Sequence, residues 1–326
     1  MTAHVNSSSL RTVLVTRHDK IGDFVLCLPL VKAIKVNNPR IRVGVLVSTV
    51  NYDFARCIEF IDFVILYGRD FWVTVRDIRK ERPDLSISCY IDNRLGALLL
   101  ASRIPIRIAP ATKIAQIFFN KRIAQRRSRV TQHEWQYNLA LAHSVFPAES
   151  FFFAPPLLHF PGTAGRLPRV IFHPGSGGSS EGNLRPLDYV RLARRVAAMS
   201  GFEAVFTFGP SDQRVCDEIR AALDFPAVVI NDPMPLIDFC KYISQSMLFV
   251  STSTGPMHLA GAVNTPTLSF FGTSLFASNR RWAPINNPQY QSNFLVGATY
   301  EPELVDRIEA QMITQLQACA STEAHQ

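Results

Sequence analysis

The 326-residue sequence lacks any pattern that would build a metal centre or a disulfide framework. Its six cysteines are scattered, with no Cys-x-x-Cys pair and no histidine at a metal-ligand spacing. Isolated cysteines of this kind are typical of reduced thiols in a cytoplasmic protein. We therefore expect a cytoplasmic protein that holds no metal ion.

Long hydrophobic runs are also absent. No stretch reaches the roughly 18 apolar residues that a membrane span needs, and the start "MTAHVNSSSLRTVLVT" has no basic region followed by a long apolar run. These absences predict a protein that is soluble or attached peripherally to a membrane.

Acidic residues are outnumbered, so the surface field is positive. The net charge is +8 and the isoelectric point is about 9.4, which favours anionic partners such as nucleotides, phosphorylated glycolipids, nucleic acid or an anionic leaflet. The sequence has no recognition helix, zinc knuckle or aromatic RNA-binding strand, so we expect no nucleic-acid partner.

Apolar residues are plentiful, at 47%, and they recur in a regular alternation of strand and helix patterns. Strands every 20 to 25 residues with helices between them indicate βαβ units and parallel sheets. The predicted strands are 11–16, 42–48, 62–67, 84–90 and 106–109 in the first half, and 169–174, 203–209, 227–231, 247–252 and 266–272 in the second. One helix is expected over 24–38 and another over 132–146.

A Pro-, Gly- and aromatic-rich stretch, 147–168, interrupts this alternation and predicts an interdomain linker. The fold class predicted is α/β with two domains, residues 1–160 and 161–326, each a doubly wound parallel sheet. We expect a ligand cleft between the carboxyl ends of both sheets. A final helix near 301–320 is expected to pack across the two domains or on the second one.

Three strand-to-helix loops carry the polar residues that could do chemistry. In "TRHDKIGD", Gly22 permits a tight turn and Asp23 falls in the first helical turn, where it is either a helix-capping carboxylate or a general base. In "HPGSGGSSEGNLRP", residues 173–186, glycines and serines collect before Pro186. Their amides and hydroxyls predict an anion pocket, although the loop matches neither GxxxxGK[ST] nor GxGxxG.

The third loop is "STSTGPMHLAGAV", residues 251–263. A buried strand ends in hydroxyl residues, and a helix begins near Gly255 and Pro256. The donors at 253–255 lie at the positive end of the helix dipole, which suits a diphosphate. His258, on the first turn, is either structural or a phosphate or sugar contact.

Taken together, these three motifs resemble glycosyltransferase family 9, the lipopolysaccharide heptosyltransferases, over about residues 11–285. The segment "TKIAQIFFNKRIAQRRSRVTQHEWQYNLAL" is similar to that family's acceptor-side segment. The resemblance implies a GT-B fold with two Rossmann-like domains, the N-terminal one for the acceptor and the C-terminal one for the nucleotide sugar. It implies an inverting, metal-independent transfer of heptose from ADP-heptose to the lipopolysaccharide inner core, either Kdo or heptose, with no cofactor.

The resemblance also assigns roles to residues. It makes Asp23 the general base, and it places the donor and its phosphates against Ser176, Gly177, Asn183, Arg185, Ser253, Thr254, Gly255 and His258. The acceptor is assigned to Lys20, Arg122, Arg126 and Arg127, of which the arginines lie in "NKRIAQRRSRV", a basic stretch that is otherwise a solvated loop. This implies a peripheral location on the inner face of the cytoplasmic membrane.

Two departures from the family pattern leave the donor sugar open. Well-known members have a Lys where Asn183 stands, and an Asp where Ser253 stands; Arg185 lies two residues from the missing cation. The alternatives are therefore a family 9 transferase that uses another nucleotide sugar, a nucleotide-sugar epimerase, or a non-catalytic protein that binds a nucleotide or a glycolipid.

Overall fold

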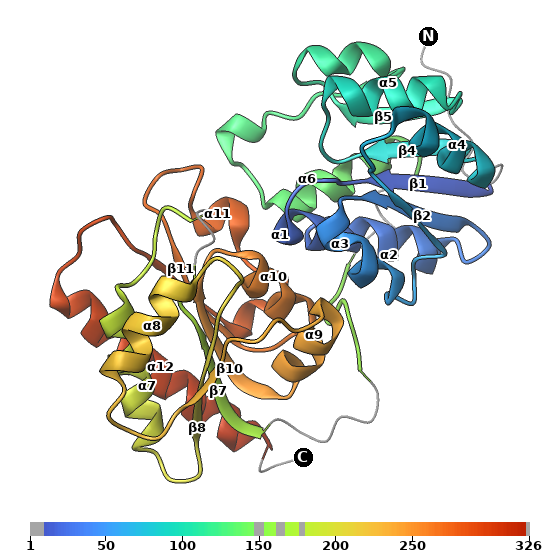
Figure 1. Ribbon diagram of the computed structural model, residues 1–326. Helices are drawn as coiled ribbons and strands as arrows, with labels where there is room; N and C mark the ends of the chain where they lie inside the picture. The colour runs from blue at the N-terminus through green and yellow to red at the C-terminus, as the bar shows by residue number, and fades with distance from the viewer. Residues whose placement is uncertain (1–9, 147–152, 161–166, 176–179, 324–326) are drawn as a thin grey trace. The chain divides into compact units, whose positions relative to one another are not determined.

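The computed structural model describes residues 10–146, 153–160, 167–175 and 180–323. The chain divides into two compact units, Met1–Leu157 and Leu158–Gln326, against a sequence-predicted boundary after residue 160. Each unit contains one six-stranded parallel sheet with helices on both faces (Figure 1). The predicted α/β class with two doubly wound domains is confirmed.

The first sheet has the strand order β3-β2-β1-β4-β5-β6. Helices α4 and α5 cover one face, and α2 and α3 cover the other (Figure 1). The strands are β1 (Thr12–Thr16), β2 (Arg42–Val47), β3 (Phe63–Leu66), β4 (Leu85–Ser88), β5 (Ile106–Pro110) and β6 (Lys121–Ile123); the helices are α1 (Ile21–Val25), α2 (Leu28–Asn37), α3 (Thr49–Arg56), α4 (Phe71–Glu81), α5 (Asn93–Ala101) and α6 (Glu134–Ala140), with 3-10 helices η2 (Ile114–Phe118), η3 (Arg127–Arg129) and η4 (Ala142–Ser144).

The second sheet repeats this winding, in the order β12-β11-β10-β7-β8-β9. Its strands are β7 (Leu167–His173), β8 (Glu203–Thr207), β9 (Val228–Ile230), β10 (Ser246–Thr252), β11 (Thr267–Phe271) and β12 (Gln291–Leu295); its helices are α7 (Pro186–Ala197), α8 (Gln213–Ala222), α9 (Leu236–Ser244), α10 (Gly255–Ala262), α11 (Asn279–Trp282) and α12 (Pro302–Glu323), with the 3-10 helix η6 (Pro288–Tyr290). The two central strands of each sheet are the first and fourth strands of its unit: β1 and β4 in the first sheet, β7 and β10 in the second.

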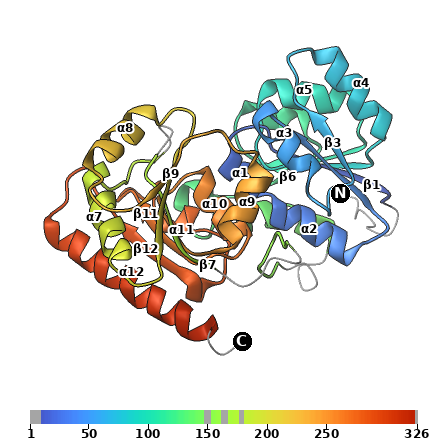
Figure 2. The same ribbon diagram turned by 60° about the horizontal axis from the view of Figure 1, so that its bottom comes forward.

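The central strands are apolar on both faces because helices cover both faces of a parallel sheet. All five residues of β1 and all seven of β10 are buried. In the second unit the core also includes Ile308, Met312 and Leu316, which recur every four residues along α12. Figure 2 shows α12 running alongside α7, so the terminal helix packs on the second unit, one of the two placements expected from its sequence.

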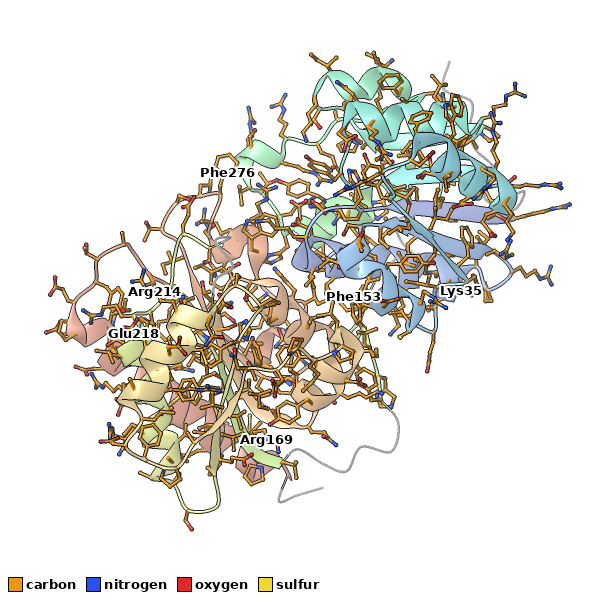
Figure 3. The ribbon with its side chains drawn as sticks, in the orientation of Figure 1. Lys35, Phe153, Arg169, Arg214, Glu218 and Phe276 are labelled. Carbon is orange, nitrogen blue, oxygen red and sulfur yellow. The ribbon has the colours of Figure 1, made fainter. Side chains whose placement is uncertain are left out.

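Charged pairs at the strand ends mark the register of the sheets. Arg169 on β7 is the register partner of Glu203 on β8, and its Nε lies 2.9 Å from the Glu203 carboxylate. Figure 3 labels Arg169 and, in the first unit, Lys35, whose Nζ lies 2.7 Å from the Asp62 carboxylate. Surface pairs of this kind contribute little stability individually.

Two predicted helices are shorter in the structure. The helix expected over 24–38 is split into α1 and α2, because Pro29 has no N–H and its ring would clash with the carbonyl of residue 25 in a continuous helix. The helix expected over 132–146 ends at Ala140 and tightens into η4, where Val145 donates to the Ala142 carbonyl. Such 3-10 bonds satisfy carbonyls that the helix end leaves without partners.

Candidate active site

In each unit the polar loops gather where the strand order reverses. The connections from β1 and β4 leave in opposite directions, as do those from β7 and β10. Open α/β sheets bind ligands outside the carboxyl ends of the strands at this switch point. The loop with Asp23 follows β1, and the loops 173–186 and 253–258 follow β7 and β10, so all three lie at switch points of their own unit.

The switch point of the first unit holds a buried cluster of charges around Arg17. Its guanidinium contacts the carboxylate of Asp23, lies 2.7 Å from Asp19 Oδ1 and 3.6 Å from Glu134 Oε1, and donates to the Cys89 carbonyl at the end of β4. Arg17 and Glu134 are almost fully buried, with 5% and 1% of their side chains exposed, whereas Asp23 keeps 17%. Asp23 is therefore held by a rigid partner but remains within reach of a ligand.

The pKa of Asp23 is raised, and burial is the main cause. Arg17 and Lys20 oppose the shift, while the negative charges of Asp19 and Glu134 add to it. A carboxylate with a raised pKa is a better proton acceptor than an exposed aspartate, because its basicity moves toward neutral pH. Lys20 occupies the N-cap position of α1, and Asp23 lies in the first turn of the helix, so Asp23 is not the N-cap.

Arg127 belongs to this cluster rather than to the exposed basic residues around it. Its Nη1 lies 2.5 Å from Glu134 Oε1 and 3.3 Å from the Cys89 carbonyl, and Nη2 donates to Asn138 Oδ1. Glu134 thus accepts a hydrogen bond from Arg127 and forms an ion pair with Arg17. To contact an acceptor as predicted, the Arg127 guanidinium would have to bind it together with Glu134.

The other three predicted acceptor residues lie on the surface. Lys20, Arg122 and Arg126 are exposed; Lys20 precedes α1, Arg122 lies on β6 and Arg126 precedes η3. All three lie in the same unit as Asp23. Their contact with an acceptor stays a prediction.

A second polar group lies beside the cluster. His18 Nε2 is 2.7 Å from Asp92 Oδ2, and the His18 ring stacks against Tyr67 with centroids 4.1 Å apart. Asp92 also accepts from the Leu95 amide at the start of α5. The pKa of Asp92 is lowered: burial would raise it, but the bonds from Leu95 and His18 outweigh burial. Asp92 is therefore an ionised anchor for the His18 ring.

In the second unit, the start of α10 is a candidate anion site. Thr254 is the N-cap, but its side chain makes no capping bond, and its hydroxyl donates to the Thr252 carbonyl instead. Ser253 and Gly255 are partly exposed. Among the described residues, no side chain caps the first amides of α10, which lie at the positive end of the helix dipole, an arrangement that favours anions.

Not every hydroxyl in this turn is available to a ligand. Thr252 donates to the Gly182 carbonyl and contacts Ser180, and it is fully buried. Ser251 Oγ is buried without a hydrogen-bond partner among the described residues. The hydroxyl-rich turn therefore presents Ser253 and the helix amides, while Thr252 fastens the neighbouring loop.

Asn183 braces the loop that follows β7. Its Nδ2 donates to the Pro174 carbonyl at 2.8 Å, and its Oδ1 accepts from Tyr189 at 2.7 Å. Both ends of the amide are therefore used, one within the loop and the other by α7. A direct bond from Asn183 to the donor stays a prediction, and Ser176 and Gly177 of the same loop lie outside the described residues.

Arg185 is exposed at the start of α7 and already has partners. Its Nε lies 2.8 Å from Asp188 Oδ2, and its guanidinium lies over the Tyr300 ring, 4.8 Å from the centroid. An exposed pair between residues three apart on a helix is weak, so a phosphate could compete for this guanidinium. The predicted phosphate contact of Arg185 remains untested.

His258 is buried in α10 and is neutral near pH 7, because burial lowers the pKa of its imidazole to about 3. Its Nδ1 has no hydrogen-bond partner among the described residues, and its ring meets Trp282 edge to face. A neutral His can hydrogen-bond a phosphate or sugar, but it adds no positive charge.

Sequence reasoning missed four residues at the first switch point: Arg17, His18, Asp92 and Glu134. Arg17 and His18 lie in the motif "TRHDKIGD", but Asp92, the partner of His18, lies 74 residues further along the chain, and Glu134, the distant partner of Arg17, lies further still. The signal that could have found them is strand order, since the residues after β1 and after β4 must meet once those strands are neighbours.

Two Rossmann-type units, each with polar loops at its switch point, are the architecture of the GT-B fold. Residues 110–306 match the profile of glycosyltransferase family 9 (heptosyltransferase). A chain of Haemophilus influenzae, assigned provisionally as a glycosyltransferase, is 32% identical over 319 residues, covering 90% of this chain and 92% of its own length. The chain belongs to glycosyltransferase family 9, and it is a glycosyltransferase.

Solved structures agree on the fold. The ADP-heptose lipopolysaccharide heptosyltransferase II of Escherichia coli superposes with a TM-score of 0.79 at 16% identity, covering 97% of this chain and 100% of that one. The Escherichia coli heptosyltransferase WaaC with ADP-2-deoxy-2-fluoro heptose gives a TM-score of 0.73 at 16% identity, covering 93% and 99%. The predicted GT-B fold is confirmed.

Proposed function

We propose that this glycosyltransferase moves heptose from ADP-heptose to the inner core of lipopolysaccharide, onto Kdo or a previous heptose, with inversion at the anomeric carbon and without a metal ion. The support is that the family is one of heptosyltransferases and that its structural relatives include an ADP-heptose lipopolysaccharide heptosyltransferase and a heptosyltransferase with an ADP-heptose analogue. We assign the acceptor to the first unit and the donor to the second.

The observation that carries this proposal is the environment of Asp23. It is a partly exposed carboxylate at a switch point, its pKa is raised by burial, and Arg17 fixes its position. Asp23 takes the proton of the acceptor hydroxyl as that oxygen bonds to the anomeric carbon. The bond from that carbon to the diphosphate oxygen breaks on the opposite face, and ADP leaves.

The start of α10 would stabilise the leaving diphosphate. The amide of Gly255 and the Thr254 segment supply donors and the helix dipole, and they are positioned before reaction. Because the pKa of His258 is about 3, His258 acts as a hydrogen-bond partner in this scheme. The remaining positive charge would come from Arg185, with Ser176, Gly177, Asn183 and Ser253 on the phosphates, nucleotide or sugar.

The location follows from the acceptor. No helix in the described part of the chain is long and apolar enough to cross a membrane. We propose a cytoplasmic protein that acts at the inner face of the cytoplasmic membrane, where Lys20, Arg122, Arg126 and Arg127 contact the anionic acceptor.

Single-turnover transfer to an inner-core acceptor tests the proposal. ADP-heptose is expected to react, whereas UDP- and GDP-sugars are not, and Asp23→Asn is expected to lower turnover about 100-fold or more while ADP affinity stays within a few-fold. Unchanged turnover in Asp23→Asn would remove Asp23 from the mechanism.

A second candidate is a family 9 transferase with a different nucleotide sugar. It is favoured by Ser253, which stands where well-known members have a sugar-binding Asp and is partly exposed beside the α10 amides. Transfer from a UDP- or GDP-sugar alone in the same assay would establish this candidate and end the heptose proposal.

A further inference from the structure

The positive charge of this chain is concentrated in one segment of the first unit. The whole chain has 34 Lys and Arg against 26 Asp and Glu, and residues 93–133 contain nine of the basic residues and none of the acidic ones. The rest of the chain is left with 25 basic and 26 acidic residues, close to neutrality. The nine residues are Arg94, Arg103, Arg107, Lys113, Lys121, Arg122, Arg126, Arg127 and Arg129.

The same segment contains an unusual 3-10 helix. In η2, side chains three residues apart lie on the same face, because a 3-10 helix has three residues per turn. Ala115 and Phe118 face inward: Ala115 is buried, and Phe118 packs on Gly96 of α5 so closely that a Cβ there would lie 2.5 Å from its ring.

The opposite face of η2 is apolar as well, and it is open to solvent. Ile114 is 79% exposed and Ile117 is 67% exposed. A solvated surface helix normally presents polar residues on its outer face. Two isoleucines on one exposed face, in the most basic segment of the chain, therefore point to a partner that is both apolar and anionic.

The same basic segment contains exposed cations that form no ion pair with a carboxylate among the described residues. Lys121 reaches back to the Ser144 carbonyl, so the alternation along β6 turns Arg122 to the other face of the sheet, where α5 and η2 pack. Arg126 and Arg129 follow the carboxyl end of β6. All three are exposed. In the described part of the chain, the neighbouring Arg127 differs from them, because it forms an ion pair with Glu134.

We infer that Ile114, Ile117, Arg122, Arg126 and Arg129 form a membrane-docking surface for an anionic lipid leaflet. The isoleucines enter the boundary between headgroups and acyl chains, and the arginines bind lipid phosphates. A short apolar insertion combined with a basic cluster is the two-part anchor that gives reversible membrane attachment. This inference rests on the proposed function for its biological setting, but the binding it describes needs neither donor nor acceptor.

Vesicle flotation with the full chain tests the surface. The protein is expected to bind vesicles of phosphatidylcholine mixed with phosphatidylglycerol, and to bind phosphatidylcholine alone much more weakly. Arg122→Gln/Arg126→Gln/Arg129→Gln should weaken binding to the mixed vesicles about 100-fold, from roughly fivefold per basic residue. Ile114→Ser/Ile117→Ser should weaken it about tenfold or more, since insertion of apolar area is lost.

Matched controls separate this surface from general charge and stickiness. Arg40→Gln/Arg56→Gln/Lys80→Gln removes three exposed cations elsewhere in the same unit, and Val36→Ser/Trp72→Ser removes two apolar side chains that are 65% and 68% exposed. Both controls should bind mixed vesicles within about twofold of the parent if short-range contact dominates. Equal losses in controls and test variants would overturn the inference.

Two further readouts separate the possible failures. Sedimentation of Ile114→Ser/Ile117→Ser against the parent detects an interface between copies; a lost dimer with unchanged vesicle binding overturns the membrane assignment. Transfer to a water-soluble acceptor with no vesicle binding defeats the docking surface and leaves the proposed function standing. Specific vesicle binding with no transfer from ADP-heptose defeats the proposed function and leaves the docking surface standing.

Discussion

Arg17 binds Asp23 within the turn that joins β1 to α1, and the same guanidinium lies 3.6 Å from Glu134, more than a hundred residues later in the chain. The contact has two effects. It fixes the direction of the Asp23 carboxylate, and its positive charge lowers a pKa that burial raises.

The first prediction concerns the pH dependence of transfer. A general base is inactive when protonated, so activity falls as the pH drops through the pKa of Asp23. Arg17→Gln removes a charge that lowers this pKa, so the acidic limb of the kcat profile should move to higher pH. Arg17→Lys keeps the charge and should move it less. A limb that stays in place in Arg17→Gln, in protein with the parent's circular dichroism spectrum, would show that Asp23 does not control it.

The second prediction concerns Arg185, which lies two residues from Asn183, the position where well-known family members have a lysine. Arg185→Ala should weaken donor binding about tenfold or more, because a charge-assisted hydrogen bond contributes roughly 1.5 to 3 kcal/mol. Asp188→Asn serves as the comparison, since it releases Arg185 from its ion pair and should leave donor affinity equal or higher. Calorimetric titration with ADP measures both, and equal affinity in Arg185→Ala and the parent would show that Arg185 does not contact the donor.

The third prediction concerns Gly182, where the loop that follows β7 passes close to the end of β11. A Cβ on Gly182 would lie 2.3 Å from the Phe271 backbone and 2.5 Å from the Gly272 amide nitrogen. Backbone cannot move aside as a side-chain tip can, so Gly182→Ala should displace the loop and weaken ADP binding, and should cost about 1 to 3 kcal/mol of stability.

Gly68→Ala is the control for this substitution. Its nearest neighbour would lie 3.8 Å away, at ordinary contact distance, and stability should change by less than about 0.5 kcal/mol. Thermal unfolding with and without ADP measures both variants. A Gly182→Ala protein with the parent's melting temperature and ADP shift would contradict the prediction.

The fourth prediction concerns stability in mild acid. Burial lowers the pKa of His173 to about 4, so the folded protein keeps this imidazole neutral. The unfolded chain takes up a proton below about pH 6.5, so stability is complete above that pH and falls by roughly 3 kcal/mol from this group as the pH approaches 4.

His173→Asn tests this directly. Its amide can keep a hydrogen bond to Thr207, which lies 2.9 Å from His173 Nδ1, and it does not titrate. Urea midpoints measured from pH 7 to pH 4.5 should fall less steeply in the variant than in the parent. Parallel curves would show that His173 does not contribute to acid instability.

The sequence was sufficient for ten of the twelve strands in the described residues, because such a strand is a short apolar run between turn residues. Both missed strands, β6 and β12, are edge strands, whereas the other two edge strands, β3 and β9, have apolar runs and were predicted. β6 reads "KRI" and β12 reads "QSNFL"; only one side of such a strand is paired, and partial exposure permits polar residues without an apolar pattern.

The candidate site was predictable to the extent that its motifs are local. Asp23 and the amides near Gly255 could be placed from the strand-to-helix turns that carry them. The Arg17–Glu134 contact could not, because it depends on the neighbouring positions of β1 and β4 and on the return of α6 to the same edge. The hydrogen bond from Tyr189 to Asn183 could not be predicted from the loop sequence either, because Tyr189 lies inside α7.

The shared winding order of the two sheets has an evolutionary consequence. Each unit owns a complete hydrophobic interior, so its loops can be replaced without taking supporting residues from the other. Under the proposed assignment of donor and acceptor, exchange of the turns after β7 and β10 would change the sugar nucleotide, and divergence near β1 and β6 would change what receives the sugar. A lineage with such an architecture can explore new pairings of substrates one half at a time.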